Sequence, residues 1–252
     1  MLKNPEISDA QIEQFRRASF VIVPGGFDAA DAALIERWTT EISEWPEQSG
    51  RHWVYHEKSL KGGDRVLINR IENMTPFHEG FAELAEILRI SVGQLLGEEV
   101  VLFKDKINFK MPGGDGFKPH QDLQAGWERY ASYFVSALVC IDEATIENGC
   151  LELAEIDSSF HLGNNWEPLT EEQTAGLKFR PAPTKPGDLV FFDSFTPHGS
   201  APNMTNRPRR LYYATYNKLS EGDHLAAYFA DKHASFPPDI DRDPSRQYVF
   251  RV

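Results

Sequence analysis

Cysteine, long apolar runs and positive charge are all scarce in this chain of 252 residues. Its two cysteines, Cys140 and Cys150, are too few for a disulfide-built scaffold, and buried free thiols in a reducing compartment are favoured over a disulfide. No run reaches the roughly eighteen apolar residues of a membrane span, and the first residues lack the pattern of a secretion signal. The net charge of −12 argues against nucleic-acid and anionic-membrane partners. We therefore expect a cytoplasmic protein that acts on a small molecule.

The pattern of apolar residues predicts a single domain, residues 1–252, in which helices precede strands. A hydrophobic content of 41% allows one large buried core. We expect a helical section (1–98), a strand-rich core (about 99–220) and a C-terminal section (221–252) that ends in a surface tail. This order is typical of a mainly β barrel or sandwich with helices on an outer face. The predicted helices are 8–19, 27–45, 80–96 and 221–233, and the predicted strands are 20–23, 66–73, 99–110, 132–141, 150–155, 188–195 and 209–217.

Three residues have the types and spacing of a metal site. His120 and Asp122 are two positions apart, so on an extended strand both point to the same side. His198 follows a predicted strand and is the candidate third ligand. Two imidazoles and one carboxylate on one face of an octahedral ion form the arrangement of non-haem Fe(II) oxygenases. A structural role for any one of these residues alone is a reasonable alternative, but the set together favours metal binding.

With these residues, the chain resembles the phytanoyl-CoA dioxygenase-like family of Fe(II)/2-oxoglutarate-dependent oxygenases over roughly residues 9–220. The resemblance implies a double-stranded β-helix (jelly-roll, cupin-like) core, with Fe(II), 2-oxoglutarate and O2 as cofactor and co-substrates. It also implies that Arg209, eleven residues after His198, binds the far carboxylate of 2-oxoglutarate. Ser200 and Asn108 match positions that contact 2-oxoglutarate in relatives.

The segment 147–152 is similar to the family's turn into its next strand, but the residues after it are different. Relatives usually continue with proline, glycine, serine and histidine, whereas residues 154–161 here read AEIDSSFH. We therefore expect a differently shaped loop at this point.

Strand alternation distinguishes Arg209 from its neighbours. It sends Arg209 and Tyr213 to one face and Arg210 and Tyr212 to the other. An arginine that enters a barrel needs an anionic partner, because an unpaired buried charge costs several kcal/mol. A carboxylate of 2-oxoglutarate supplies that partner in a bidentate contact. Arg209 is therefore favoured over Arg207 as its ligand.

The predicted strand 99–110 carries a basic face. Lys104, Lys106 and Lys110 share this face with Asn108, and they alternate with the residues of a largely apolar face, Phe103, Asp105, Ile107 and Phe109. One interpretation is a solvated edge of the sheet. The other is that some of these lysines face the entrance to the active site and attract an anion.

Arg70, Glu72 and Trp127 complete the candidate substrate contacts. Arg70 and Glu72 lie on one face of the predicted strand 66–73, where they either pair with each other or bind a zwitterion. Trp127 follows the metal motif in a predicted lid, together with Arg129, and either packs there or contacts substrate.

These features together predict a dioxygenase that hydroxylates a C–H bond of a small polar molecule, anionic or zwitterionic, and releases succinate and CO2. Among the activities of the family, hydroxylation of an aminoalkylphosphonate such as 2-aminoethylphosphonate fits the charges. The alternatives are an acyl-CoA or other natural-product hydroxylase and a cupin-like metal-binding sensor without turnover. A zinc or manganese hydrolase would leave Arg209 without a role. The sequence does not determine the oligomeric state.

Overall fold

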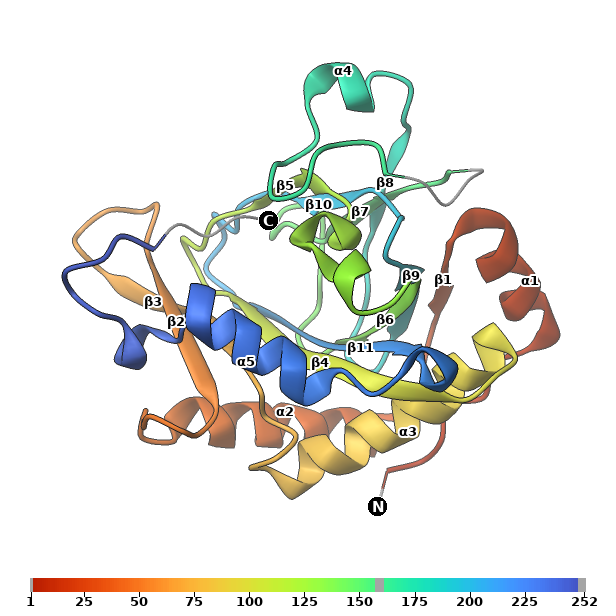
Figure 1. Ribbon diagram of the computed structural model, residues 1–252, viewed down its shortest axis with the longest axis horizontal. Coiled ribbons are helices and arrows are strands. Elements are labelled where there is room, and N and C mark those ends of the chain that lie inside the picture. Colours follow the sequence, from red (N-terminus) through yellow and green to blue (C-terminus); the bar gives the residue numbers. More distant parts are fainter. Residues whose placement is uncertain (1, 157–160, 249–252) are drawn as a thin grey trace.

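Two antiparallel sheets face each other in the computed structural model, which describes residues 2–156 and 161–248 (Figure 1). The larger sheet has seven strands in the order β1-β9-β6-β11-β4-β3-β2, and the smaller has four in the order β5-β10-β7-β8. This arrangement confirms the predicted mainly β, jelly-roll fold class. The strands are β1 (Phe20–Val23), β2 (Trp53–Lys58), β3 (Val66–Glu72), β4 (Val100–Lys110), β5 (Phe117–His120), β6 (Phe134–Cys140), β7 (Leu151–Ala154), β8 (Phe179–Ala182), β9 (Leu189–Asp193), β10 (His198–Ser200) and β11 (Arg209–Lys218).

The predicted helices are present, with small shifts at their ends. Ser8 forms a capping box with Gln11 at the start of the first helix, and Gly97 ends the third in a left-handed conformation. The last helix begins later than predicted, because residues 219–221 form a separate 3-10 turn. In the described part of the chain, no helix combines the length and apolarity needed to cross a membrane. The helices are α1 (Asp9–Ala18), α2 (Ala29–Glu44), α3 (Glu79–Leu96), α4 (Glu171–Thr174) and α5 (Leu225–Ser235).

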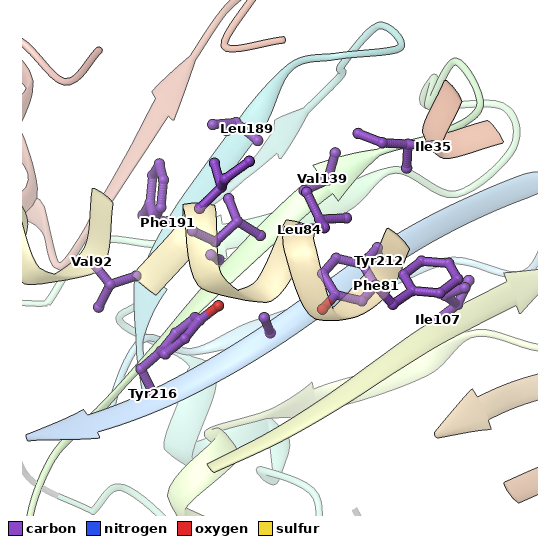
Figure 2. Close-up of a cluster of buried hydrophobic side chains, with 14 of the residues drawn as sticks. Ile35, Phe81, Leu84, Val92, Ile107, Val139, Leu189, Phe191, Tyr212 and Tyr216 are labelled. Carbon is purple, nitrogen blue, oxygen red and sulfur yellow. The ribbon is translucent and has the colours of Figure 1, made fainter. Parts of the chain in front are cut away.

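The main hydrophobic core lies between the larger sheet and the helices on its outer face (Figure 2). Phe81 and Leu84 of α3 pack on β11, where the ring of Phe81 stacks on Tyr212 with 5.4 Å between centroids. The Tyr216 hydroxyl, also on β11, donates a 2.6 Å hydrogen bond to the carbonyl oxygen of Ala85. Each large apolar side chain buried in this way contributes about 1.5–3 kcal/mol. The core thus fixes β11, and with it the opposite, inner face of the strand.

Strands β4 and β11 pair in the middle of the larger sheet and carry side chains to both faces. Tyr212 faces the outer core and Arg209 is buried on the inner side, as strand alternation predicts. The prediction for Phe103 is wrong, because its ring packs on Trp127 instead of joining Ile107 in the outer core. The pairing of β4 with β11 shifts beside Phe103, and such a bulge reverses the alternation locally.

The segment after α5 does more than cover the surface. The ring of Phe236 stacks on Tyr55 of β2 at 5.5 Å between centroids. Asp239 accepts a 2.7 Å hydrogen bond from the backbone nitrogen of His56. Later in the same segment, Gln247 and Tyr248 line the cavity described below. The described residues 236–248 are thus packed over the surface beside β2, and some of them also form part of the cavity wall.

Two predictions concern the residues that flank β7. Cys150, just before this strand, is buried and free, as is Cys140 on β6, so the prediction of free thiols is confirmed. Burial raises the pKa of Cys140 to about 12, which keeps the thiol protonated. The loop expected to differ from relatives, 154–161, includes residues 157–160, which lie outside the described residues. Its different shape stays a prediction.

Candidate active site

Two neighbouring strands of the smaller sheet bring the candidate histidine ligands together. His120 at the end of β5 pairs directly with His198 at the start of β10, and their rings are 4.2 Å apart between centroids. Asp122 completes the group, and one ligand atom from each of the three residues lies within 4.8 Å of the others. These distances are short enough for all three side chains to ligate one ion.

One part of the sequence argument for this group is wrong. Asp122 does not share a strand with His120, since β5 ends at His120 and Asp122 begins a 3-10 turn that spans Asp122–Ala125. Gln121 between them keeps an extended backbone. The turn is closed by Gln124, whose side chain accepts a 2.7 Å hydrogen bond from the Gln121 backbone nitrogen. The carboxylate thus reaches the site from a turn, not from a strand.

Backbone carbonyl groups orient both imidazoles. Nδ1 of His120 lies 2.7 Å from the carbonyl oxygen of Lys118, and Nδ1 of His198 lies 2.9 Å from that of Thr196. A carbonyl oxygen only accepts, so each Nδ1 carries the proton and each Nε2 presents a lone pair. Burial lowers the pKa of His120 to about 3, which favours the neutral imidazole that a metal ion requires.

Asp122 is held as a carboxylate. Its Oδ2 atom accepts a 3.3 Å hydrogen bond from the Ser136 hydroxyl, and its Oδ1 atom lies 3.9 Å from Nε2 of His198. Burial raises its pKa, but the electrostatic influence of the neighbouring His198, Lys104 and Lys106 outweighs burial and lowers the pKa to about 2. The group therefore supplies two neutral nitrogen ligands and one charged oxygen ligand, the set that suits a divalent iron ion.

A second set of polar atoms lies on the inner side of β11 and β4. Arg209 is 1% exposed, and its Nε and Nη2 atoms have no hydrogen-bond partner among the described residues. Oδ1 of the buried Asn108 has none there either. Tyr213 links the two side chains through hydrogen bonds. Arg207, by contrast, is exposed and lies 3.6 Å from Glu143. Unpartnered buried donors of this kind are expected where a ligand binds.

The basic residues of β4 divide between two places. Lys104 and Lys106 line a cavity that also includes His120 and Asp122, whereas Lys110 donates a 2.6 Å hydrogen bond to Ser200 on β10. The alternative of a solvated sheet edge is wrong, because β4 lies between β3 and β11. The other interpretation, that some of these lysines face the active site, agrees with the positions of Lys104 and Lys106, whereas Lys110 lies at the far end of the strand.

The cavity has a volume of about 520 Å³ and reaches the candidate metal site. Strands β3 and β4, the turns after β5 and helix α5 all contribute to its wall. Its lining residues are Arg70, Glu72, Lys104, Lys106, Phe117, His120, Asp122, Ala125, Gly126, Trp127, Arg129, Tyr130, Trp166, Tyr228, Asp231, Lys232, Ser235, Phe236, Gln247 and Tyr248.

Glu72 is the centre of a buried ion-pair cluster in this wall. Its Oε1 atom lies 2.7 Å from Nε of Arg70, and its Oε2 atom lies 2.5 Å from Nζ of Lys232. Burial raises the pKa of Glu72, but Lys232, Arg70 and Lys104 outweigh burial and lower it to about 2. The internal pairing of Arg70 with Glu72 is thus present, and the pair also faces the cavity.

Trp127 is packed on Phe103 and also lines the cavity, so its contact with substrate stays a prediction. The ring is 1% exposed, and Nζ of Lys104 lies 3.9 Å from its centroid. Burial, with the nearby charge of Lys106 next, lowers the pKa of Lys104 well below its ordinary value. Arg129 also lines the cavity, where it pairs with Asp231 at 2.7 Å.

Sequence reasoning missed the contribution of α5. Tyr228, Asp231, Lys232 and Ser235 all line the cavity, and their spacing places them on one face of the helix. Three of these four residues lie within the predicted helix 221–233, so their shared face could have been recognised from the sequence. The pairing of Lys232 with Glu72, 160 positions apart, was not available from the sequence.

A jelly-roll barrel that holds two imidazoles and one carboxylate at its mouth defines the class of non-haem iron oxygenases. The sequence model of the phytanoyl-CoA dioxygenase (PhyH) family matches residues 15–211. The chain belongs to this family of Fe(II)/2-oxoglutarate-dependent dioxygenases. The predicted family and enzyme class are confirmed, and the alternative of a metal sensor without turnover is not supported.

Three known proteins illustrate the similarity. The 2-aminoethylphosphonate dioxygenase of the uncultured bacterium HF130_AEPn_1 is 40% identical over 243 residues, which cover 94% of this chain and 92% of that protein. The methylphosphonate hydroxylase of Gimesia maris is 36% identical over 239 residues, covering 92% and 89%. The crystal structure of EctD from S. alaskensis with 2-oxoglutarate and 5-hydroxyectoine has a TM-score of 0.69 at 24% identity, covers 85% of this chain and 77% of that chain, and shows the shared fold.

Proposed function

We propose that this dioxygenase hydroxylates a C–H bond of a small phosphonate, such as 2-aminoethylphosphonate. The observation that carries the proposal is the surplus of positive charge in the cavity beside the candidate metal site. Arg70, Lys104, Lys106 and Lys232 line it together, and Glu72 is the carboxylate with which two of them pair. Buried cations without enough anions are costly, so a bound dianion would stabilise the folded site.

The candidate ligands fit the iron and 2-oxoglutarate that such a reaction uses. His120, Asp122 and His198 would hold Fe(II), since their ligand atoms converge and both Nε2 atoms are free. Arg209, Ser200 and Asn108 would hold 2-oxoglutarate. Supporting this assignment, Arg209 has unpartnered buried donors. When bound, the iron supplies the oxidation by dioxygen that hydroxylates the substrate and converts 2-oxoglutarate to succinate and CO2. The chain itself positions the substrate and excludes water.

The cavity residues suit the two ends of an aminoalkylphosphonate. The oxygen atoms of a phosphonate accept several hydrogen bonds, and the ammonium groups of Lys104 and Lys106 would donate them. Burial lowers the pKa of each lysine, and a nearby dianion would raise it. Asp231 and Tyr130, joined by a 2.6 Å hydrogen bond, also line the cavity and would attract an ammonium group.

An acyl-CoA substrate is the weaker candidate. Only its acyl chain would enter a cavity of about 520 Å³ beside the metal ligands, and the rest of the molecule would remain outside. The buried cations would then face hydrocarbon, which leaves their charges without compensation.

We also propose a single-domain enzyme in a reducing, cytoplasmic compartment. The two buried free cysteines support this location, since an oxidising compartment favours disulfides. The acidic net charge of −12 supports a small-molecule substrate and argues against a nucleic acid.

A lysine substitution tests the substrate assignment. The iron-loaded protein is given 2-oxoglutarate and either 2-aminoethylphosphonate, methylphosphonate or a neutral long-chain acid, and succinate is measured. We expect stimulation by the phosphonates, and we expect Lys106→Met to raise the phosphonate KM about tenfold or more through loss of a charge-assisted contact. Lys178→Met, an exposed control, should leave KM unchanged. Stimulation by the long-chain acid alone, in both proteins equally, would contradict the proposal.

A further inference from the structure

Lys110 lies beside Arg209 on the buried inner face of the larger sheet. The two residues are directly paired across β4 and β11, so their side chains leave the sheet on the same side. Lys110 is 2% exposed. Its Nζ atom donates hydrogen bonds to the Ser200 hydroxyl at 2.6 Å and to the carbonyl oxygen of Ala201 at 2.5 Å. It is therefore fixed next to two residues already assigned to 2-oxoglutarate.

A glycine makes this position for Lys110 available. Gly149 has a φ of +75°, and a Cβ atom there would lie 2.0 Å from the carbonyl oxygen of Ala201 and 3.2 Å from Nζ of Lys110. Any larger residue would collide with the backbone that accepts the lysine hydrogen bond. The main chain of Lys110 is held as well, because its carbonyl oxygen accepts a 2.8 Å hydrogen bond from Asn203. The site is thus built around the lysine.

Two cations directly opposite each other on a buried surface repel unless an anion lies between them. Within residues 2–156 and 161–248, no carboxylate forms an ion pair with Lys110 or Arg209. The other titratable groups that face Lys110 are Glu57, Asp115 and Cys150. Burial, and next the charge of Arg209, lower the pKa of Lys110 to about 6, despite these acidic groups. An anion bound between Arg209 and Lys110 would therefore stabilise the charged form of the lysine.

We infer that Lys110 is a second cationic ligand for the far carboxylate of 2-oxoglutarate, acting together with Arg209 and Ser200. An ammonium group has three hydrogens. Two of them are used by Ser200 and Ala201, and the third is available to a carboxylate oxygen between Lys110 and Arg209. The inference rests on the proposed co-substrate site and not on the identity of the substrate.

A consequence is that 2-oxoglutarate binding takes up a proton. Above about pH 6 the lysine is largely neutral before binding, and the arriving carboxylate raises its pKa. Between the pKa of Lys110 in the free protein and its pKa in the complex, the affinity for 2-oxoglutarate falls as pH rises, by roughly up to tenfold per pH unit. Burial raises the pKa of the nearby Glu57 as well, and an arriving anion raises it further, so the comparison with Lys110→Met assigns the proton to the lysine.

Calorimetric titration of the iron-loaded protein without dioxygen tests the inference. For the wild-type protein, titration with 2-oxoglutarate at pH 7.5 in buffers of different ionisation enthalpy should reveal proton uptake. Lys110→Met should remove that uptake and raise Kd about tenfold or more. The exposed control Lys178→Met should match the wild type. Retained iron content would show that the metal site is intact.

A second titrant separates a direct contact from a structural role. 2-Oxopentanoate has the chain length of 2-oxoglutarate but lacks the far carboxylate. The Kd of 2-oxopentanoate should be the same in wild type and Lys110→Met. If the lysine had only a structural role, the substitution would weaken the binding of both compounds equally. Absence of proton uptake by the wild type would overturn the inference even if the variant failed to fold. A wild-type protein that does not bind 2-oxoglutarate at all would instead contradict the proposed function.

Discussion

Replacing Glu72 by glutamine should destabilise the protein strongly and in a pH-dependent manner. Glu72 is 2% exposed and pairs with Arg70 at 2.7 Å and with Lys232 at 2.5 Å. The substitution removes the negative charge but keeps the shape of the side chain. Arg70 and Lys232 would then lose the charge of Glu72 while they remain buried beside Lys104, and removing the anion from a buried ion pair is costly.

The magnitude follows from the pKa of Glu72, which is lowered from 4.5 to about 2 in the folded protein. At about 1.4 kcal/mol for each pKa unit, the ionised carboxylate contributes roughly 3 kcal/mol to folding at neutral pH. Because the folded pKa lies below the unfolded one, this contribution is complete above about pH 4.5 and is lost as pH falls toward 2. The variant should therefore differ from the wild type less at pH 3 than at pH 7.

Urea unfolding of both proteins at these two pH values measures the difference. Glu98→Gln is the matched control, because Glu98 forms a 2.7 Å ion pair with Lys218 in which both side chains are about one-third exposed. Solvent screens such a pair, so we expect little change. Equal destabilisation by the two substitutions, or a Glu72→Gln effect independent of pH, would refute the assignment of Glu72 as the anion that holds the cavity cations.

Two further substitutions test the remaining parts of the site. His198→Ala should abolish both iron retention, measured by metal analysis, and succinate formation, because only two of the three protein ligands remain. Turnover at the wild-type rate would show that the ligand set is wrong. Arg209→Ala should weaken 2-oxoglutarate binding by about 2–5 kcal/mol, measured by calorimetry, because it removes a buried charge-assisted contact. The exposed Arg207→Ala should change binding little, and equal effects of the two would contradict the burial argument.

Local periodicity predicted the four longer helices and seven of the strands, but not the strands β2, β5, β8 and β10. Alternation along β11 identified Arg209 as the inward-facing arginine, and apolar spacing identified the helix that became α3 within one residue of its start. Both features depend on a few consecutive residues and a fixed period, which any sequence displays directly. The pairing of His120 with His198 is different, because it depends on the order of strands in the smaller sheet. The family resemblance supplied that order.

The features that sequence reasoning missed depend on irregular backbone or on distant pairing. The bulge in β4 that redirects Phe103 depends on the register with β11, and the 3-10 turn at Asp122 depends on a hydrogen bond that the Gln124 side chain accepts from the Gln121 backbone. Lys232 joins the cavity only because α5 returns to pack on β4. None of these contacts produces a period in the sequence, so alternation alone assigned the residues to the wrong neighbours or overlooked them.

The central claim is that this family member inserts oxygen into a small phosphonate. The most direct measurement is the reaction of the iron-loaded protein with 2-oxoglutarate, 2-aminoethylphosphonate and ¹⁸O-labelled dioxygen, followed by mass spectrometry of both products. We expect succinate and hydroxylated phosphonate in equal amounts, with labelled oxygen in both. Succinate formed at the same rate without phosphonate, with the phosphonate recovered unchanged, would contradict the claim.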